Sequence, residues 1–239
     1  MINYMKSEHY RLIRKKSLHM TGVICLLLIA AATAVLYYSG QQDPNFPYAT
    51  SLFLYSSVIG NALLIMIVGL LFNSILTGKD TSLIKQSVSF GISRNTIFWS
   101  KLILTLSYFL LLCVIGLLLT IALGETFLAS EEQSVNNYLI ASSNMVPIVL
   151  GGFILIHVLK MLKVSEAYII ILFLFIFIFS GDLLYMLFDY TPSTLLNENL
   201  MSFMNQEAQF DYRHWGVGII ISVISLLIGV KRFAKINID

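Results

Sequence analysis

Hydrophobic residues along this chain gather into six long runs separated by short polar segments. A helix that crosses the hydrocarbon core of a bilayer needs about 20 mostly apolar residues. The runs near this length are Met20 to Tyr38, Ser51 to Leu76, Leu102 to Leu123, Tyr138 to Leu159, Val164 to Leu183 and Trp215 to Val230. Each must be helical in lipid, because a backbone without water has to satisfy its own polar groups. The pattern predicts an all-α membrane protein with six transmembrane helices.

The first run also has a feature of secretory signal peptides. Ala32-Thr33-Ala34 follows a basic start in the manner of a cleavage site. The apolar run nevertheless continues beyond it and ends in Tyr37-Tyr38, as a span ends in the aromatic belt of the membrane surface. We therefore expect a retained helix.

Composition places the whole chain in the membrane class. Hydrophobic residues make up 57% of the sequence and charged residues 12%, whereas soluble domains carry about 25% charged residues. Residues 1–239 are expected to form a single transmembrane domain, since little chain remains for a soluble one. Cys25 and Cys113 lie inside apolar runs and are expected to face lipid or the core. A disulfide framework or a metal site would need more cysteines at closer spacing.

The charges are segregated between the two sides of the predicted bundle. Every lysine and arginine except Arg213 falls on the side that holds both termini. The other side collects acidic residues, namely Asp43, Glu125, Glu131, Glu132, Asp189, Glu198, Glu207 and Asp211. Because basic residues are retained in the cytoplasm, both termini are expected to be cytoplasmic.

The segment 1–19 is expected to be a helix lying in the cytoplasmic membrane interface. Helical spacing puts one set of largely apolar residues on one face and most of the basic residues on the other; the first set is Ile2, Met5, His9, Leu12 and Ile13. The alternative is an ordinary basic flank that only sets the topology of the first span.

The loop 77–101 is the longest on the basic side, and it carries helix caps. Asp80 or Thr81 could begin a short helix that runs to Phe90, and Gly91 suits the left-handed residue that ends it. Ser93 could then cap a second helix that leads into the third span. A loop with two caps and an apolar set is expected to be a docking element, the alternative being a helix lying flat on the lipid.

On the opposite side, the segment 182–213 mixes apolar and polar residues and is expected to form one or two short helices in the outer leaflet.

No catalytic motif is present. The chain has no phosphate-binding loop that ends in Lys-Ser or Lys-Thr, no histidine pair at metal-binding spacing and no Gly-x-Ser-x-Gly elbow. We expect a protein that is not an enzyme and that binds no cofactor, metal or nucleic acid itself.

Polar residues inside the spans are the remaining candidates for function. Such residues are costly in lipid and usually point into the bundle, where they join helices or contact a substrate. The possible translocation path consists of Asn61, Ser142, Ser143, Asn144 and Pro147. Asn73 is expected to face inward as well, and Gly151-Gly152 to allow close helix packing. Asp182 and His157 are expected to lie at the outer and the cytoplasmic boundary, respectively.

The order of these parts resembles the membrane subunit of type-2 ABC exporters, also called ABC-2 permeases. The likeness rests on Leu83-Ile84-Lys85-Gln86-Ser87-Val88-Ser89-Phe90-Gly91-Ile92-Ser93-Arg94, followed by Trp99-Ser100-Lys101-Leu102. Within it, Gly-x-Ser-Arg and Ser-Lys-Leu carry most of the similarity.

The resemblance implies that residues 77–94 hold a coupling helix, which docks on a separate cytoplasmic ABC ATPase that binds ATP and magnesium. The coupling residues would be Leu83, Ile84, Lys85, Val88, Phe90, Gly91 and Arg94. It also implies pairing with a second permease copy or a paralogue, in the cytoplasmic membrane of a bacterium, as in Gram-positive exporters. The cargo would be an amphipathic or otherwise lipophilic peptide, as for phenol-soluble modulin exporters and lantibiotic-immunity transporters.

Two other classes of function stay open. A non-transporting scaffold or regulatory subunit would also lack catalytic groups, although it would not need a capped docking loop. An ion-driven secondary carrier would need inverted repeats and ionisable residues near the membrane midplane, which the sequence does not show.

Overall fold

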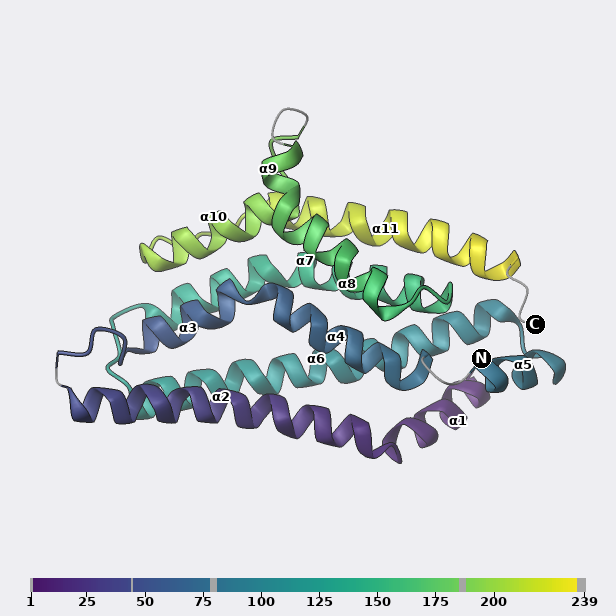
Figure 1. Cartoon of the computed structure of the whole chain (residues 1–239), viewed down its shortest axis with the longest axis horizontal. Coiled ribbons are helices and arrows are strands. Elements are labelled where there is room, and N and C mark those ends of the chain that lie inside the picture. Colours follow the sequence, from purple (N-terminus) through teal and green to yellow (C-terminus); the bar gives the residue numbers. More distant parts are fainter. Residues whose placement is uncertain (1, 44, 78–80, 185–187, 236–239) are drawn as a thin grey trace.

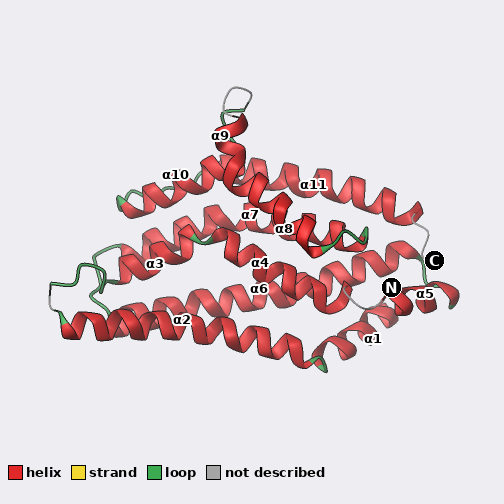
Figure 2. Cartoon of the chain, in the orientation of Figure 1, coloured by secondary structure: helices red, strands yellow, loops and turns green. Residues whose placement is uncertain are grey.

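The computed structural model describes residues 2–43, 45–77, 81–184 and 188–235, and every regular element in these ranges is a helix (Figure 2). Five helical segments are long and apolar enough to cross a membrane. They are α2 (Lys16–Gln42), α6 (Arg94–Phe127), α7 (Ser134–Met161), the continuous stretch Glu166–Leu184 and α11 (Tyr212–Lys235). The prediction of an all-helical protein with several long apolar helices is therefore confirmed.

The second apolar run differs from the prediction, because it is broken into two helices. α3 (Ser51–Gly60) and α4 (Ala62–Thr77) meet at Asn61 with a bend of 58°. The Asn61 side chain donates a hydrogen bond to the Ser57 carbonyl at 2.6 Å, and its backbone N–H bonds to Val58. These hydrogen bonds satisfy polar groups that the helix break would leave unpaired. The two helices count as a sixth span only if they cross the membrane as one unit.

The remaining helices lie at one end and along one side of the bundle. α1 (Ile2–Ile13) and α5 (Thr81–Ser89) lie at the end where both chain termini are found (Figure 1). A π-helical stretch (η1, Phe175–Phe179) joins α8 (Glu166–Leu174) to α9 (Ser180–Leu184), which projects from the side of the bundle. α10 (Pro192–Met204) begins with a capping box between Thr191 and Thr194 and packs on α3 and α7.

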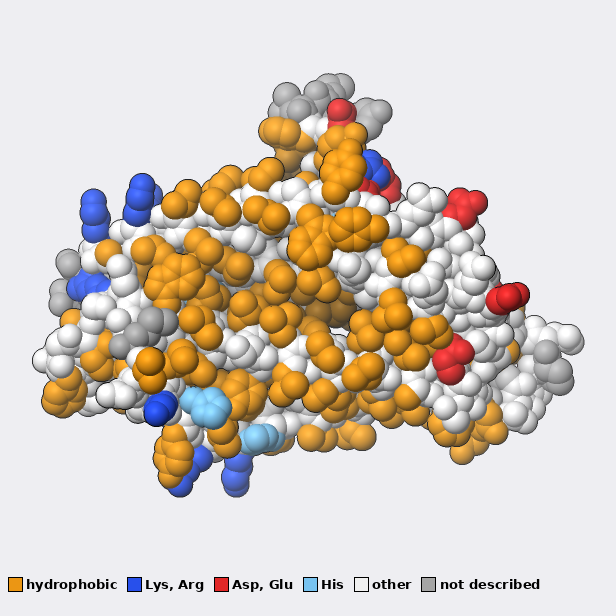
Figure 3. Space-filling view, turned by 180° about the vertical axis from the view of Figure 1, so that it is seen from behind, with side chains coloured by type: hydrophobic (Ala, Val, Ile, Leu, Met, Phe, Trp, Pro, Cys, Tyr) orange, Lys and Arg blue, Asp and Glu red, His pale blue; other side chains and the backbone are white. Residues whose placement is uncertain are grey.

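The charge segregation expected from the sequence recurs on the folded surface. In Figure 3, blue basic side chains gather at one end of the visible face and red acidic side chains toward the opposite end. The basic end is the one that carries α1, α5 and both termini.

α7 is the central helix. Of its most apolar 18-residue window 61% is buried, compared with 6% for α2. It packs most closely against α11, where a Cβ on Gly151 would lie 2.9 Å from the Gly218 carbonyl oxygen and a Cβ on Gly229 would lie 2.6 Å from Val158. Gly152 faces Met66 of α4 and Phe173 of α8 with equally little space. The expectation that Gly151-Gly152 permits close helix packing is confirmed.

The buried side chains form two hydrophobic cores, divided at the α3–α4 bend. The larger core includes Met66 of α4, Phe98 and Phe109 of α6, and Phe153 of α7. The smaller core lies toward the acidic end and contains residues of α3, α7 and α10, namely Leu54, Tyr55, Ile59, Tyr138, Ala141 and Phe203, together with Leu128 and Ala208. The buried residues of α3 pack in the smaller core and those of α4 pack in the larger core. The bend therefore allows one apolar run of the sequence to contribute to both cores.

α1 packs on the bundle through only part of its length. Leu12 is fully buried and Met5 partly so, whereas Ile2 and Ile13 are exposed. Glu8 is also buried, with 6% of its surface exposed. Its carboxylate can be buried because two basic side chains contact it, as described next.

Candidate functional site

α5 is an exposed helix with a well-formed C-terminal cap. Gly91 has φ of +81°, and its N–H bonds to the Val88 carbonyl at 3.0 Å, while the Ile92 N–H bonds to the Ser87 carbonyl at 3.1 Å. This pair of bonds is the Schellman motif, which ends a helix at a left-handed residue. Ser93 then accepts the Thr96 N–H at the start of α6. The predicted roles of Gly91 and Ser93 are confirmed; the predicted caps at Asp80 and the Thr81 side chain lie outside what the structure describes.

The proposed coupling residues divide between the two faces of α5. Leu83, Lys85 and Phe90 are exposed, and Phe90 shows 83% of its surface. Ile84 is buried and Val88 is half-buried against the larger core. Arg94, at the start of α6, donates a hydrogen bond at 2.9 Å to the Ala234 carbonyl of α11. The helix therefore has an inner face that attaches it and an outer face that is open.

A buried ionic cluster lies next to α5 and α1. Lys101 of α6 is 1% exposed, donates to the Leu76 carbonyl at 2.5 Å and lies 3.7 Å from the Glu8 carboxylate. Arg11 contacts the same carboxylate at 2.6 Å. Tyr4 lies beside Glu8 and Ser87, and burial together with the negative charge of Glu8 raises the pKa of its phenol above the usual value. The cluster thus connects α1, α5, α6 and the end of α4.

Two lysines hold the C-terminus of α4. Lys101 donates to Leu76, and Lys15, between α1 and α2, donates to the Ile75 carbonyl. The last carbonyls of a helix lack intrahelical partners and carry the negative end of its dipole, so ammonium groups stabilise them. The sequence did not reveal this contact, because the partner carbonyls of Lys101 and Lys15 lie on α4, which is distant from both lysines in the sequence.

The predicted translocation residues do not form one path. Ser142, Asn144 and Pro147 are buried on α7 and Ser143 is half-buried, whereas Asn61 is exposed at the α3–α4 bend. Asn144 donates to the Asn199 side chain at 3.1 Å and to the Gln209 carbonyl at 2.8 Å, and it accepts the Asp211 N–H at 3.0 Å. Pro147 packs against Gly218 of α11. Asn144 and Pro147 therefore join helices, and Ser142 alone of these five residues lines the apolar cavity described below.

His157 lies four residues before the end of α7 at Met161, inside the bundle. It is fully buried, with Nδ1 at 2.9 Å from Asn73 Oδ1 and Nε2 at 3.3 Å from the Phe98 carbonyl. Asn73 is also fully buried, as expected. The sequence could not predict the burial of His157 or its hydrogen-bond partners, because these partners come from α4 and α6, far away in the sequence.

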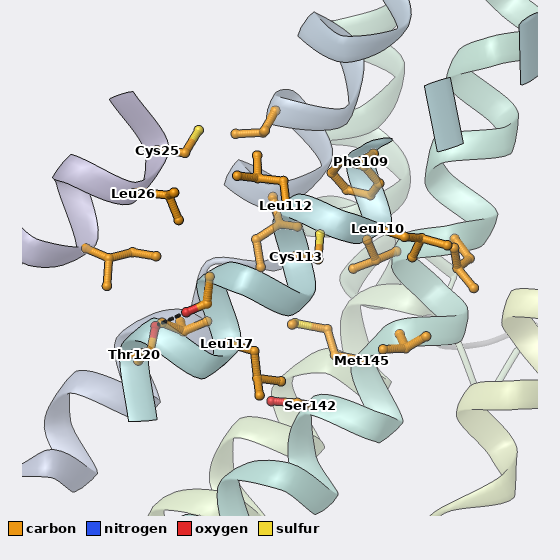
Figure 4. A pocket seen from close by; sticks show the side chains of 18 of the residues that line it. Cys25, Leu26, Phe109, Leu110, Leu112, Cys113, Leu117, Thr120, Ser142 and Met145 are labelled. Carbon is orange, nitrogen blue, oxygen red and sulfur yellow. Dashed lines mark hydrogen bonds between the residues drawn. The ribbon is translucent and has the colours of Figure 1, made fainter. Parts of the chain in front are cut away.

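An apolar cavity of about 190 Å³ lies among α2, α3, α4, α6 and α7. Figure 4 shows Cys25 and Leu26 of α2 across from Leu112 and Cys113 of α6, with Met145 and Ser142 of α7 on a further side. This cavity could not be predicted from the sequence, because its lining comes from five helices and each helix contributes residues that are typical of any membrane span.

A second, polar cavity of about 450 Å³ lies at the acidic end between α10 and the start of α11. Arg213 bonds to Asp211 at 2.7 Å and to Glu198 at 3.1 Å on its wall. The hydrogen bonds from Arg213 lower the pKa of the Asp211 carboxyl below its usual value. Arg213, the one basic residue that the sequence placed on this side, is thus neutralised by acidic neighbours.

Within the described ranges, no three His, Cys, Asp or Glu side chains lie close enough together to hold a metal ion. Comparison of the chain with family models, with curated proteins and with solved structures finds no match.

Proposed function

We propose that this chain is the membrane subunit of an ATP-driven exporter of amphipathic or lipophilic peptides, with α5 as the docking helix for a separate ABC ATPase. The observation that carries the proposal is the exposed outer face of α5, with Phe90 at its tip and Gly91 closing it. A large aromatic side chain that is almost fully exposed on a capped helix is typical of an anchor that a partner buries.

The position of α5 supports this proposal. The helix lies at the basic end, beside both chain termini, where residues retained in the cytoplasm are expected. In the proposal, α3 and α4 form one broken span, the chain crosses the membrane six times, and a second copy or a paralogue completes the transporter.

The contacts of α5 also supply a route for movement. Its neighbour Tyr4 lies beside Glu8, and Glu8 lies 3.7 Å from Lys101, which holds the end of α4. In the proposed mechanism, the ATPase closes on ATP, displaces α5, and shifts α1 and the end of α4 with it. The ATP and magnesium belong to the partner.

The test is purification of the tagged protein from its native membrane in mild detergent, followed by identification of the proteins that accompany it. We expect a soluble ATPase in stoichiometric amount, and we expect Phe90→Ala to remove most of it. Tyr10→Ala is the matched control, since Tyr10 is an exposed aromatic residue of α1 at the same end and lies off α5. If no ATPase accompanies the protein, the exporter proposal fails and a scaffold role takes its place.

A further inference from the structure

The apolar cavity is bounded by side chains that suit a hydrocarbon chain. Its wall includes Leu26 and Ile29 of α2, Val68 of α4, Leu112 of α6 and Val149 of α7. At about 190 Å³ it is smaller than the 300–1,000 Å³ sites that hold drug-sized ligands. A single alkyl chain fits this space, whereas a helical peptide does not.

One polar atom in the cavity lacks a partner. Ser142 is 6% exposed, and its hydroxyl completes no hydrogen bond to a described residue; the phenol of Tyr138, one turn earlier on α7, is its polar neighbour in the cavity wall. Thr120, on the neighbouring wall, instead donates to the Gly116 carbonyl at 2.8 Å (Figure 4). A buried hydroxyl without a partner costs free energy that a ligand acceptor would recover.

The polar and apolar parts of the cavity are arranged along the bundle axis. Thr120 and Ser142 lie in the part of the cavity toward the acidic end. Phe109 lies 11 residues before Thr120 on α6, so it is about 16 Å farther from the acidic end, because an α-helix rises about 1.5 Å per residue. An acyl chain of a lipid in the leaflet at the acidic end has the same order, with its ester carbonyl near the surface and its methylene groups toward the midplane.

α2 forms the wall of the cavity on the side least covered by the rest of the chain. α2 is the least buried of the long helices, with 6% of its apolar window covered by the rest of the chain. We propose that the cavity binds one acyl chain of a membrane phospholipid, with the ester carbonyl accepting the Ser142 hydroxyl. This site is independent of the exporter function and of any ATPase.

The proposal can be tested by photo-crosslinking of the whole protein in phosphatidylcholine nanodiscs that contain a small fraction of a phosphatidylcholine with a diazirine in one acyl chain. We expect crosslinks on the cavity-lining residues of α6 and α7, at a yield that saturates at one chain per protein. Ser142→Ala should lower the labelling of these residues about five- to tenfold at limiting probe, because one hydrogen bond is lost. Ser143→Ala is the matched control, since Ser143 is half-buried and does not line the cavity.

A variant that fills the cavity with a larger side chain provides a second test of the proposal. Gly116 lines the cavity, and a Cβ there has Ile29 as its nearest neighbour at 3.5 Å, so Gly116→Phe should abolish labelling of the lining while outward-facing residues of α11 are still labelled. If this variant does not fold, the Ser142 and Ser143 pair decides. Labelling that is spread evenly over the lipid-facing surfaces and is unchanged in all variants would overturn the proposal. The proposal would also be overturned if a trace of free fatty acid displaced the probe and an excess of phospholipid did not.

Discussion

At the scale of single residues, buried polar side chains fasten helices that are distant in the sequence. Asn144 joins α7 to α10 and to the chain before α11, and His157 joins α7 to α4 and α6. The sequence predicted that Asn73 and Asn144 point inward, because a polar group facing lipid is costly. It could not predict their partners, since these depend on which helices become neighbours.

His157 provides a test at this scale. His157→Ala removes hydrogen bonds to Asn73 and Phe98 and leaves a cavity where α4, α6 and α7 meet. We expect a loss of about 2–4 kcal/mol in the free energy of unfolding, measured as a lower thermal midpoint in detergent. His19→Ala is the control, because His19 is exposed and bonds only to the nearby Ile13 carbonyl; its effect should stay within about 0.5 kcal/mol. Equal midpoints for the two variants would contradict this role.

At the scale of helices, local chemistry was predictable and longer-range geometry was not. The C-terminal end of α5 and the start of α6 follow from Gly91 and Ser93, whose capping preferences act within a few residues. The break at Asn61 was missed because the apolar run from Ser51 to Leu76 continues through it. The burial of Glu8 on α1 could not be predicted, because its partner Lys101 is distant in the sequence.

The cap of α5 can be tested with a pair of glycines that both have open space. Gly91 has a positive φ and Gly216 of α11 does not, and a Cβ at either position would meet nothing within 4 Å. Gly91→Ala should therefore cost about 1–2 kcal/mol through backbone strain alone, whereas Gly216→Ala should be neutral or slightly stabilising. Hydrogen exchange checks this: the amides of Phe90 to Ile92 should exchange faster only in Gly91→Ala. Unchanged protection there would show that the left-handed conformation does not limit the cap.

At the scale of the whole molecule, the charge distribution predicts how the bundle is oriented in a membrane. The basic end, with α1 and α5, should face the cytoplasm, and the acidic end should face outward. The sequence predicted this segregation well, because the charged residues lie between the apolar runs and the order of the runs fixes their side.

Cysteine labelling in intact cells tests the orientation. In a variant with Cys25→Ala and Cys113→Ala, single cysteines are introduced as Ser7→Cys in α1, Ser89→Cys in α5 or Ser130→Cys before α7, all at exposed positions. A membrane-impermeant maleimide should label only Ser130→Cys until the membrane is permeabilised. Labelling of Ser89→Cys from outside, with Ser7→Cys protected, would mean that the α3–α4 pair does not return the chain to the side of its N-terminus.

The division of the interior at the α3–α4 bend has a practical consequence for genetics. Damage to the stacked rings of Tyr55 and Tyr138, whose centroids lie 4.5 Å apart, falls in the smaller core. The larger core, which carries the inner face of α5, shares none of those residues. If the proposed exporter function holds, a substitution at the acidic end should abolish transport in a protein that still binds the ATPase, and such an allele would act as a dominant inhibitor of the intact copy.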